Sequence, residues 1–117
     1  MVSELKHVPV LLDPLLKYLK TKLHPGSTIL DGTFGAGGYS KALLDAGYRV
    51  IAFDCDPMAA SIAKTIRSNS FHFFQDNFSN LSSVMRQHSI SNTQFDACVF
   101  DLGVSSMQVL TLTGKCI

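Results

Sequence analysis

The chain has 117 residues, of which 46% are hydrophobic and 16% are charged, and its formal net charge is +1. This length is about that of one domain, and no apolar run approaches the ~18 residues that a membrane-spanning helix needs. A net charge so close to zero excludes a basic field over the whole chain, so any affinity for nucleic acid must come from a local surface.

The predicted elements alternate between helices and strands along the chain. Asp13 is the predicted cap of a helix, Pro14 takes its first helical position, and Pro25 ends it. The same cap and proline recur at Asp56 and Pro57. The predicted strands are residues 28–30, 48–53, 71–74 and 95–100, and the later predicted helices are residues 39–46, 57–68 and a segment capped by Ser79 that reaches His88.

This alternation predicts an α/β fold. Strands separated by helices of about ten residues form right-handed βαβ crossovers, which build a parallel, doubly wound sheet. In the usual strand order 3-2-1-4, the first, second and fourth strands lie side by side. Ligands of such sheets bind outside the carboxyl ends of the strands, where the strand order reverses. The residues that directly follow these strands are therefore the candidates for a site.

Four glycines lie within seven residues directly after the first predicted strand, in the stretch ILDGTFGAGGYS (residues 29–40). Glycine lacks a Cβ atom, so the backbone can approach a ligand, and the helix that follows directs unpaired N–H groups at an anion there. The alternative is that the glycines only make a tight turn between strand and helix, for which two would suffice. We therefore expect a ligand with an anionic group at this loop.

Asp54 follows the second strand, 19 residues after Gly35. At about this interval, nucleotide-binding βαβ units place an acid that accepts hydrogen bonds from ribose hydroxyls. The nicotinamide pattern G-x-G-x-x-G is not met, because Ser40 stands where its third glycine belongs. S-adenosylmethionine is therefore the first prediction for the cofactor, with the loop at its methionine end and Asp54 at its ribose, and a dinucleotide is the second.

Two further residues are candidates for this site. Asp101 follows the fourth strand, where a carboxylate would face the reacting end of the cofactor, although Asp is also an ordinary turn or cap residue. Phe78 ends a short turn after the third strand and is a candidate to cover an adenine ring, the alternative being packing in the core. The cysteines and histidines show no spacing typical of metal ligands, so no metal site is predicted.

Four sequence blocks carry a resemblance to a known family. They begin at His7 (HVPVLL), Asp31 (DGTFGAGG), Asp54 (DCDP) and Asp101 (DLGVSSMQ). In this order and spacing they resemble the ribosomal small-subunit RNA cytosine-N4 methyltransferases of bacteria and mitochondria, over about residues 7–108. The resemblance implies a Rossmann-like class I S-adenosylmethionine-dependent methyltransferase fold, truncated after about the fourth parallel strand. It also implies N4-methylation of a cytidine in small-subunit ribosomal RNA, with that RNA or the small ribosomal subunit as partner.

The resemblance also implies a set of site residues. Asp101 is the catalytic candidate, as a hydrogen-bond acceptor near the cytosine amine. Tyr39 departs from the family, which usually has a histidine there. Carried over by position, the residues expected to contact S-adenosylmethionine are Gly37, Gly38, Tyr39, Asp54, Phe78, Asp101 and Gln108.

The stretch after Gln108 departs most from the family, which continues there with further motifs and strands, whereas this chain reads VLTLTGKCI. We expect a leading segment and helix at residues 1–27, a cofactor-binding βαβ region at 28–108 and a divergent tail at 109–117. We also expect the fourth strand to remain an unpaired apolar edge, and this chain alone to have weak or no activity.

The remaining expectations concern compartment and alternative functions. No targeting segment is visible at the amino terminus, which leaves the mitochondrial matrix or the cytoplasm, with no role for a membrane. The alternatives to a methyltransferase are a fragment of an NAD-type dinucleotide-binding enzyme and a non-catalytic interaction fragment.

Overall fold

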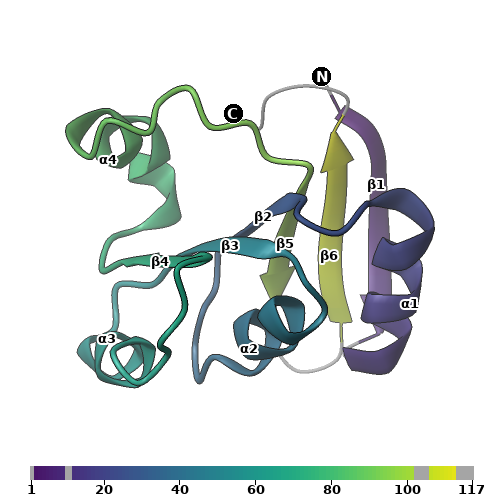
Figure 1. Cartoon of the computed structure of the whole chain (residues 1–117), viewed down its shortest axis with the longest axis horizontal. Helices are drawn as coiled ribbons and strands as arrows, with labels where there is room; N and C mark the ends of the chain where they lie inside the picture. Colours follow the sequence, from purple (N-terminus) through teal and green to yellow (C-terminus); the bar gives the residue numbers. More distant parts are fainter. Residues whose placement is uncertain (1, 10–11, 102–105, 113–117) are drawn as a thin grey trace.

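A computed structural model describes the backbone of residues 2–9, 12–101 and 106–112, and the side chains of residues 12–100 (Figure 1). Strands and helices alternate through most of the chain. In chain order the elements are β1 Val2–Pro9, α1 Leu12–Lys22, β2 Thr28–Asp31, α2 Gly38–Asp45, β3 Arg49–Phe53, α3 Pro57–Ala63, β4 Phe71–Phe74, the 3-10 turn η1 Phe78–Asn80, α4 Leu81–Gln87, β5 Ala97–Asp101 and β6 Ser106–Leu112.

The strands form one sheet in the order β1-β6-β5-β2-β3-β4. Strands β2 to β5 are the four that the sequence predicts, and they are parallel to one another. In register, Ile29 of β2 lies between Val50 of β3 and Ala97 of β5. This is the expected order 3-2-1-4, which confirms the α/β class and places the ends of β2, β3 and β5 side by side.

Local signals explain where the helices begin. Asp56 caps α3, because its side chain accepts a hydrogen bond of 2.9 Å from the N–H of Met58, and Pro57 is the first helical residue. The helix ends at Ala63, shorter than the predicted 57–68. The helix α1 begins at Leu12, so Asp13 lies in its first turn and not before it.

The predicted cap of the fourth helix is wrong. Ser79 does not cap it; instead Asn77 caps the turn η1, with its side-chain oxygen accepting a hydrogen bond of 2.9 Å from the N–H of Ser79. The helix α4 then continues from Leu81. An Asn and a Ser both suit such a position, so the sequence alone does not decide between two caps that lie two residues apart.

The expectation that the fourth predicted strand is an unpaired edge is also wrong. This strand, β5, pairs with β2 on one side and with the antiparallel strand β6 on the other, where Val99 lies opposite Val109. Strand β6 pairs in turn with β1. The pairing supplies hydrogen-bond partners for the backbone groups that an edge would expose. Residues 109–112 of the predicted tail therefore belong to the sheet.

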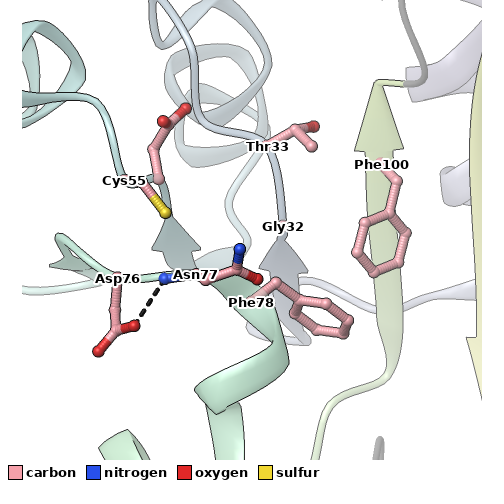
Figure 2. Close-up of a pocket in the computed structure, with 8 residues that line it drawn as sticks. Gly32, Thr33, Cys55, Asp76, Asn77, Phe78 and Phe100 are labelled. Atoms are coloured by element: carbon pink, nitrogen blue, oxygen red, sulfur yellow. Dashed lines mark hydrogen bonds between the residues drawn. The ribbon is translucent and has the colours of Figure 1, made fainter.

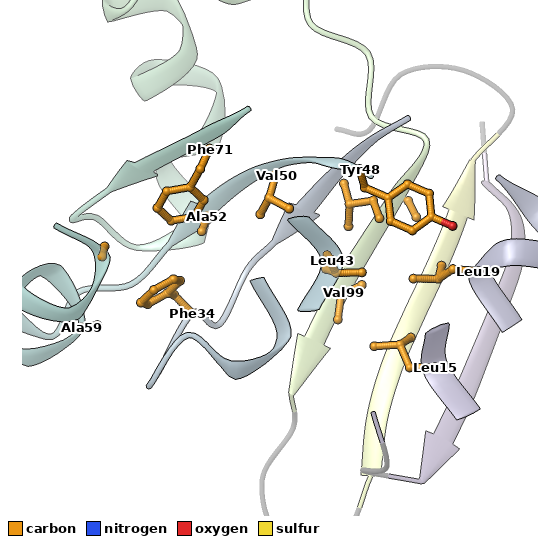
Figure 3. Packing of buried hydrophobic residues seen from close by; sticks show 13 residues of the cluster. Leu15, Leu19, Phe34, Leu43, Tyr48, Val50, Ala52, Ala59, Phe71 and Val99 are labelled. Atoms are coloured by element: carbon orange, nitrogen blue, oxygen red, sulfur yellow. The ribbon is translucent and has the colours of Figure 1, made fainter. Parts of the chain in front are cut away.

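Both faces of the central strand β2 are buried, as are Val50 to Phe53 of β3, as expected for a sheet covered by helices on two sides. Figure 1 shows α4 on the side opposite to α2 and α3. Adjacent residues of one strand point to opposite faces of the sheet. Ile29 therefore packs in the hydrophobic core that includes residues of α1, α2 and α3, whereas Leu30 packs in the core that includes residues of α4. Figure 3 shows the first of these cores. Burial raises the pKa of the Tyr48 phenol, which lies in the first of these cores.

In the part of the chain that the structure describes, no helix is both long enough and apolar enough to cross a membrane.

Candidate functional site

A cavity of about 340 Å³ lies at the carboxyl ends of the parallel strands (Figure 2). Its volume is within the range typical of small-molecule sites, and its position follows the rule for ligands of parallel sheets. Every lining residue comes from the end of β2, β3, β4 or β5 or from the segment that follows. They are Gly32, Thr33, Asp54, Cys55, Asp76, Asn77, Phe78 and Phe100.

Asp54 connects the cavity to the glycine loop. Its Oδ2 accepts a hydrogen bond of 2.8 Å from the N–H of Gly35, and its Oδ1 accepts one of 3.0 Å from the N–H of Asp56. Asp54 is half-buried, and each carboxylate oxygen can accept a second hydrogen bond. The acid after β3 and the loop after β2 therefore form one structural unit that still has acceptor capacity for a ligand.

A buried carboxylate fixes the two ends of this loop. Asp31 is 1% exposed, its Oδ1 accepts a hydrogen bond of 3.1 Å from the N–H of Thr33, and its Oδ2 accepts one of 2.7 Å from the hydroxyl of Ser40. Burying a carboxylate is costly unless it is hydrogen-bonded, so these contacts explain why an acid ends an otherwise apolar strand. Sequence reasoning missed this role.

An aromatic side chain anchors the middle of the loop in the core. Phe34 is 2% exposed and packs edge to face against Phe73, with ring centroids 5.2 Å apart. Gly37 has a φ of +85°, and a Cβ atom there would lie 2.7 Å from the ring of Phe34. Glycine at this position is therefore explained by backbone conformation and packing.

Two phenylalanines form an apolar wall of the cavity. The rings of Phe78 and Phe100 meet edge to face, with centroids 4.8 Å apart and an interplanar angle of 73° (Figure 2). Phe78 is the first residue of η1, and Phe100 belongs to β5. The wall therefore combines a ring from the segment after β4 with a ring from β5, and the strands β2 and β3 lie between β4 and β5 in the sheet.

The structure brings together only some of the predicted site residues. Asp54 and Phe78 line the cavity. Gly37, Gly38 and Tyr39 lie at the start of α2, outside the lining set, and the half-buried Tyr39 packs against the core on that side.

The side chains of Asp101 and Gln108 lie outside the described residues. Backbone pairing places Asp101 at the end of β5 opposite Met107, and places Gln108 opposite Phe100. The role of Asp101 therefore stays a prediction.

Sequence reasoning missed several lining residues. The signal for Asp76 and Asn77 was their place in the short segment that follows a parallel strand. Asp76 organises this turn, because its Oδ1 accepts hydrogen bonds of 2.7 Å from the N–H of Asn77 and of 2.7 Å from the amide of Asn80. No comparable signal marked Phe100, which lies within a strand. Among the described residues, no three His, Cys, Asp or Glu side chains are placed to hold a metal ion.

Comparison with known proteins identifies the family. The family model described as the MraW methylase family matches residues 4–113. The chain belongs to the MraW methylase family. Similar proteins include the ribosomal RNA small subunit methyltransferases H of Bartonella henselae, 43% identical over 107 residues, and of Caulobacter vibrioides, 39% identical over 108 residues. These matches cover 89% and 92% of this chain but only 29% and 32% of the relatives.

Solved structures agree on the fold. A putative methyltransferase from an antibiotic biosynthesis pathway of Anabaena variabilis matches 62% of this chain and 30% of its own, with a TM-score of 0.52 and 25% identity. An rRNA methylase from Streptococcus thermophilus matches 83% of this chain and 92% of its own, with a TM-score of 0.54 and 13% identity. The chain has the Rossmann-like fold of class I methyltransferases through about its fourth parallel strand.

Proposed function

We propose that this chain forms the S-adenosylmethionine-binding part of an enzyme that methylates N4 of a cytidine in small-subunit ribosomal RNA. Family membership and the names of the relatives support the reaction class. The observation that carries the proposal is the hydrogen bond of 2.8 Å from the Gly35 N–H to Asp54. It places the glycine loop and the acid after the next strand at one cavity, which are the two features that nucleotide-binding βαβ units use to contact a ribose-bearing cofactor.

The residues present fit this cofactor. Asp54 would accept hydrogen bonds from the ribose hydroxyls with its remaining lone pairs, and Phe78 would cover the adenine ring. The start of α2, at Gly37, Gly38 and Tyr39, would contact the methionine end through its backbone N–H groups, so tyrosine in place of histidine is tolerated there. When bound, S-adenosylmethionine supplies an electrophilic methyl group.

Asp101 is the proposed acceptor for the target amine. The exocyclic amine of cytosine is a poor nucleophile, because its lone pair is delocalised into the ring. A carboxylate that accepts a hydrogen bond from its N–H would increase electron density on the nitrogen and orient it. Asp101 directly follows Phe100, which lines the cavity, and Gln108 lies opposite Phe100 in the sheet. Both residues would therefore lie near the cofactor end of β5.

The partner in this proposal is small-subunit ribosomal RNA or the small ribosomal subunit. A target base must be unstacked to enter such a cavity. The chain spans only about three tenths of the length of the relatives it matches, so we propose weak or no activity for this chain alone. Their bacterial origin supports the cytoplasmic alternative and not the mitochondrial one.

Ligand-dependent thermal unfolding of residues 1–117 tests this function. We expect S-adenosylmethionine, and not NAD, to raise the Tm, because a ligand that binds only the folded state stabilises it by mass action. Protection by NAD alone would favour the dinucleotide enzyme, and protection by neither would favour a non-catalytic interaction fragment. In the same preparation, robust methyl transfer to ribosomal RNA would contradict the proposed lack of activity.

A further inference from the structure

Gly32 is the first residue after β2, and its lack of a side chain has a specific cause. Its φ is outside the left-handed region, so no turn conformation requires glycine here. A Cβ atom at Gly32 would instead collide with the ring of Phe100. The N–H of Gly32 donates a hydrogen bond of 3.0 Å to the carbonyl of Val99, which holds the two backbones together. The ring of Phe100 therefore occupies the space that a side chain at position 32 would fill.

Phe100 in turn contacts Phe78 through the edge-to-face pair at 4.8 Å. The backbone at Phe78 is fixed by the Asn77 cap, because the Ser79 N–H donates a hydrogen bond of 2.9 Å to the Oδ1 of Asn77. A capped backbone does not by itself set the direction of a half-buried side chain. Both rings pack against the core beneath α4, and both line the cavity. Phe100 is thus placed to hold the ring of Phe78 as one wall.

We propose that Phe100 is a positioning residue that orients Phe78 toward the adenine ring of the cofactor, and that Gly32 is required to make room for it. The inference rests on the proposed function, because it assumes that the wall receives an aromatic base. Phe100 acts through Phe78 in this account. Aromatic pairs of this geometry stabilise one another beyond the area they bury, which favours one ring orientation over others.

Two measurements on the 117-residue chain test the inference. Aromatic ¹³C relaxation reports the order of the Phe78 ring, and calorimetry reports the Kd for S-adenosylmethionine. We expect Phe100→Leu to lower the order of the Phe78 ring and to weaken binding by about three- to tenfold. Combined with Phe78→Ala, Phe100→Leu should weaken binding no further, because the ring that it orients is absent.

Substitution of Gly32 provides an independent test of the same inference. Gly32→Ala should disturb the Phe78 ring and weaken binding as Phe100→Leu does. The double variant Gly32→Ala/Phe100→Ala should be no worse than Phe100→Ala alone, because truncation to alanine removes the ring atoms that a Cβ at position 32 would meet. Phe74→Leu is the matched control: Phe74 packs against the same core and contacts Phe53 and His88, but does not line the cavity. It should change neither measurement.

Each outcome decides the inference. Unchanged order of the Phe78 ring in Phe100→Leu would overturn it even if S-adenosylmethionine binds. Losses of affinity that multiply between the Phe100 and Phe78 variants would also overturn it, since the two rings would then act independently. If the wild-type chain binds no S-adenosylmethionine, the proposed function fails and the orientation toward adenine fails with it, while the order of the Phe78 ring in Phe100→Leu still shows separately whether Phe100 holds that ring.

Discussion

At Gly37, backbone conformation and packing require glycine for two separate reasons. A φ of +85° lies in the left-handed region, where a side chain costs about 1–2 kcal/mol. The ring of Phe34 also lies where a Cβ atom would be, and forcing extra atoms into a packed core typically costs about 1–3 kcal/mol. The glycine loop is therefore held in shape by its own packing before any ligand binds.

Gly26 is a matched control that separates the two effects. It has a φ of +88°, but a Cβ atom there would meet nothing within 4 Å. We expect Gly26→Ala to lower the free energy of unfolding by about 1–2 kcal/mol, and Gly37→Ala to lower it by about 1–3 kcal/mol more. Chemical denaturation measures both. Equal losses would show that the ring of Phe34 moves aside without cost.

The sequence predicted where the glycine loop lies but not why each of its residues is there. Four glycines in seven residues indicated a ligand-binding loop, yet Gly32 and Gly37 make room for Phe100 and Phe34. The buried contact between Asp31 and Ser40 also had no recognisable signal. These roles depend on side-chain directions in the folded chain, which spacing along the sequence does not report.

At the scale of elements, local signals predicted the presence and order of the helices and parallel strands, but not every helix boundary. The cap and proline at Asp56 and Pro57 set the start of α3 where the sequence predicts it. The missed strands β1 and β6 pair with each other and with β5. Such pairing depends on a partner distant in the sequence, because β propensity reflects the neighbours of a strand more than its own composition.

The cap of α3 gives a prediction for one element. Asp56→Ala should lower the free energy of unfolding by about 1 kcal/mol, because the N–H of Met58 loses its acceptor. Asp56→Asn keeps a side-chain oxygen at the same place, and it should cost only a few tenths of that value. Urea denaturation compares the two variants. If Asn and Ala destabilise equally, the side-chain oxygen is not the source of the stability.

At the scale of the molecule, the strand order explains how much of the site the sequence predicted. Because β2, β3 and β5 are neighbours, acids and loops far apart in the chain reach one edge of the sheet. That rule placed Asp54 at the cavity, whereas Phe78, which follows β4, was a candidate from its turn and from the family resemblance. It did not predict Phe100, whose ring reaches the cavity from within β5. It also did not predict that the start of α2 lies outside the set of residues that line the cavity.

The central claim is that Asp54 binds the ribose of S-adenosylmethionine at this cavity. Calorimetry of the wild-type chain, Asp54→Asn and Asp45→Asn tests it most directly, since Asp45 is an exposed acid at the end of α2, outside the cavity. We expect Asp45→Asn to match the wild type and Asp54→Asn to bind at least about tenfold more weakly, the loss expected for hydrogen bonds to a charged acceptor. Equal affinity of Asp54→Asn and the wild type would contradict the account.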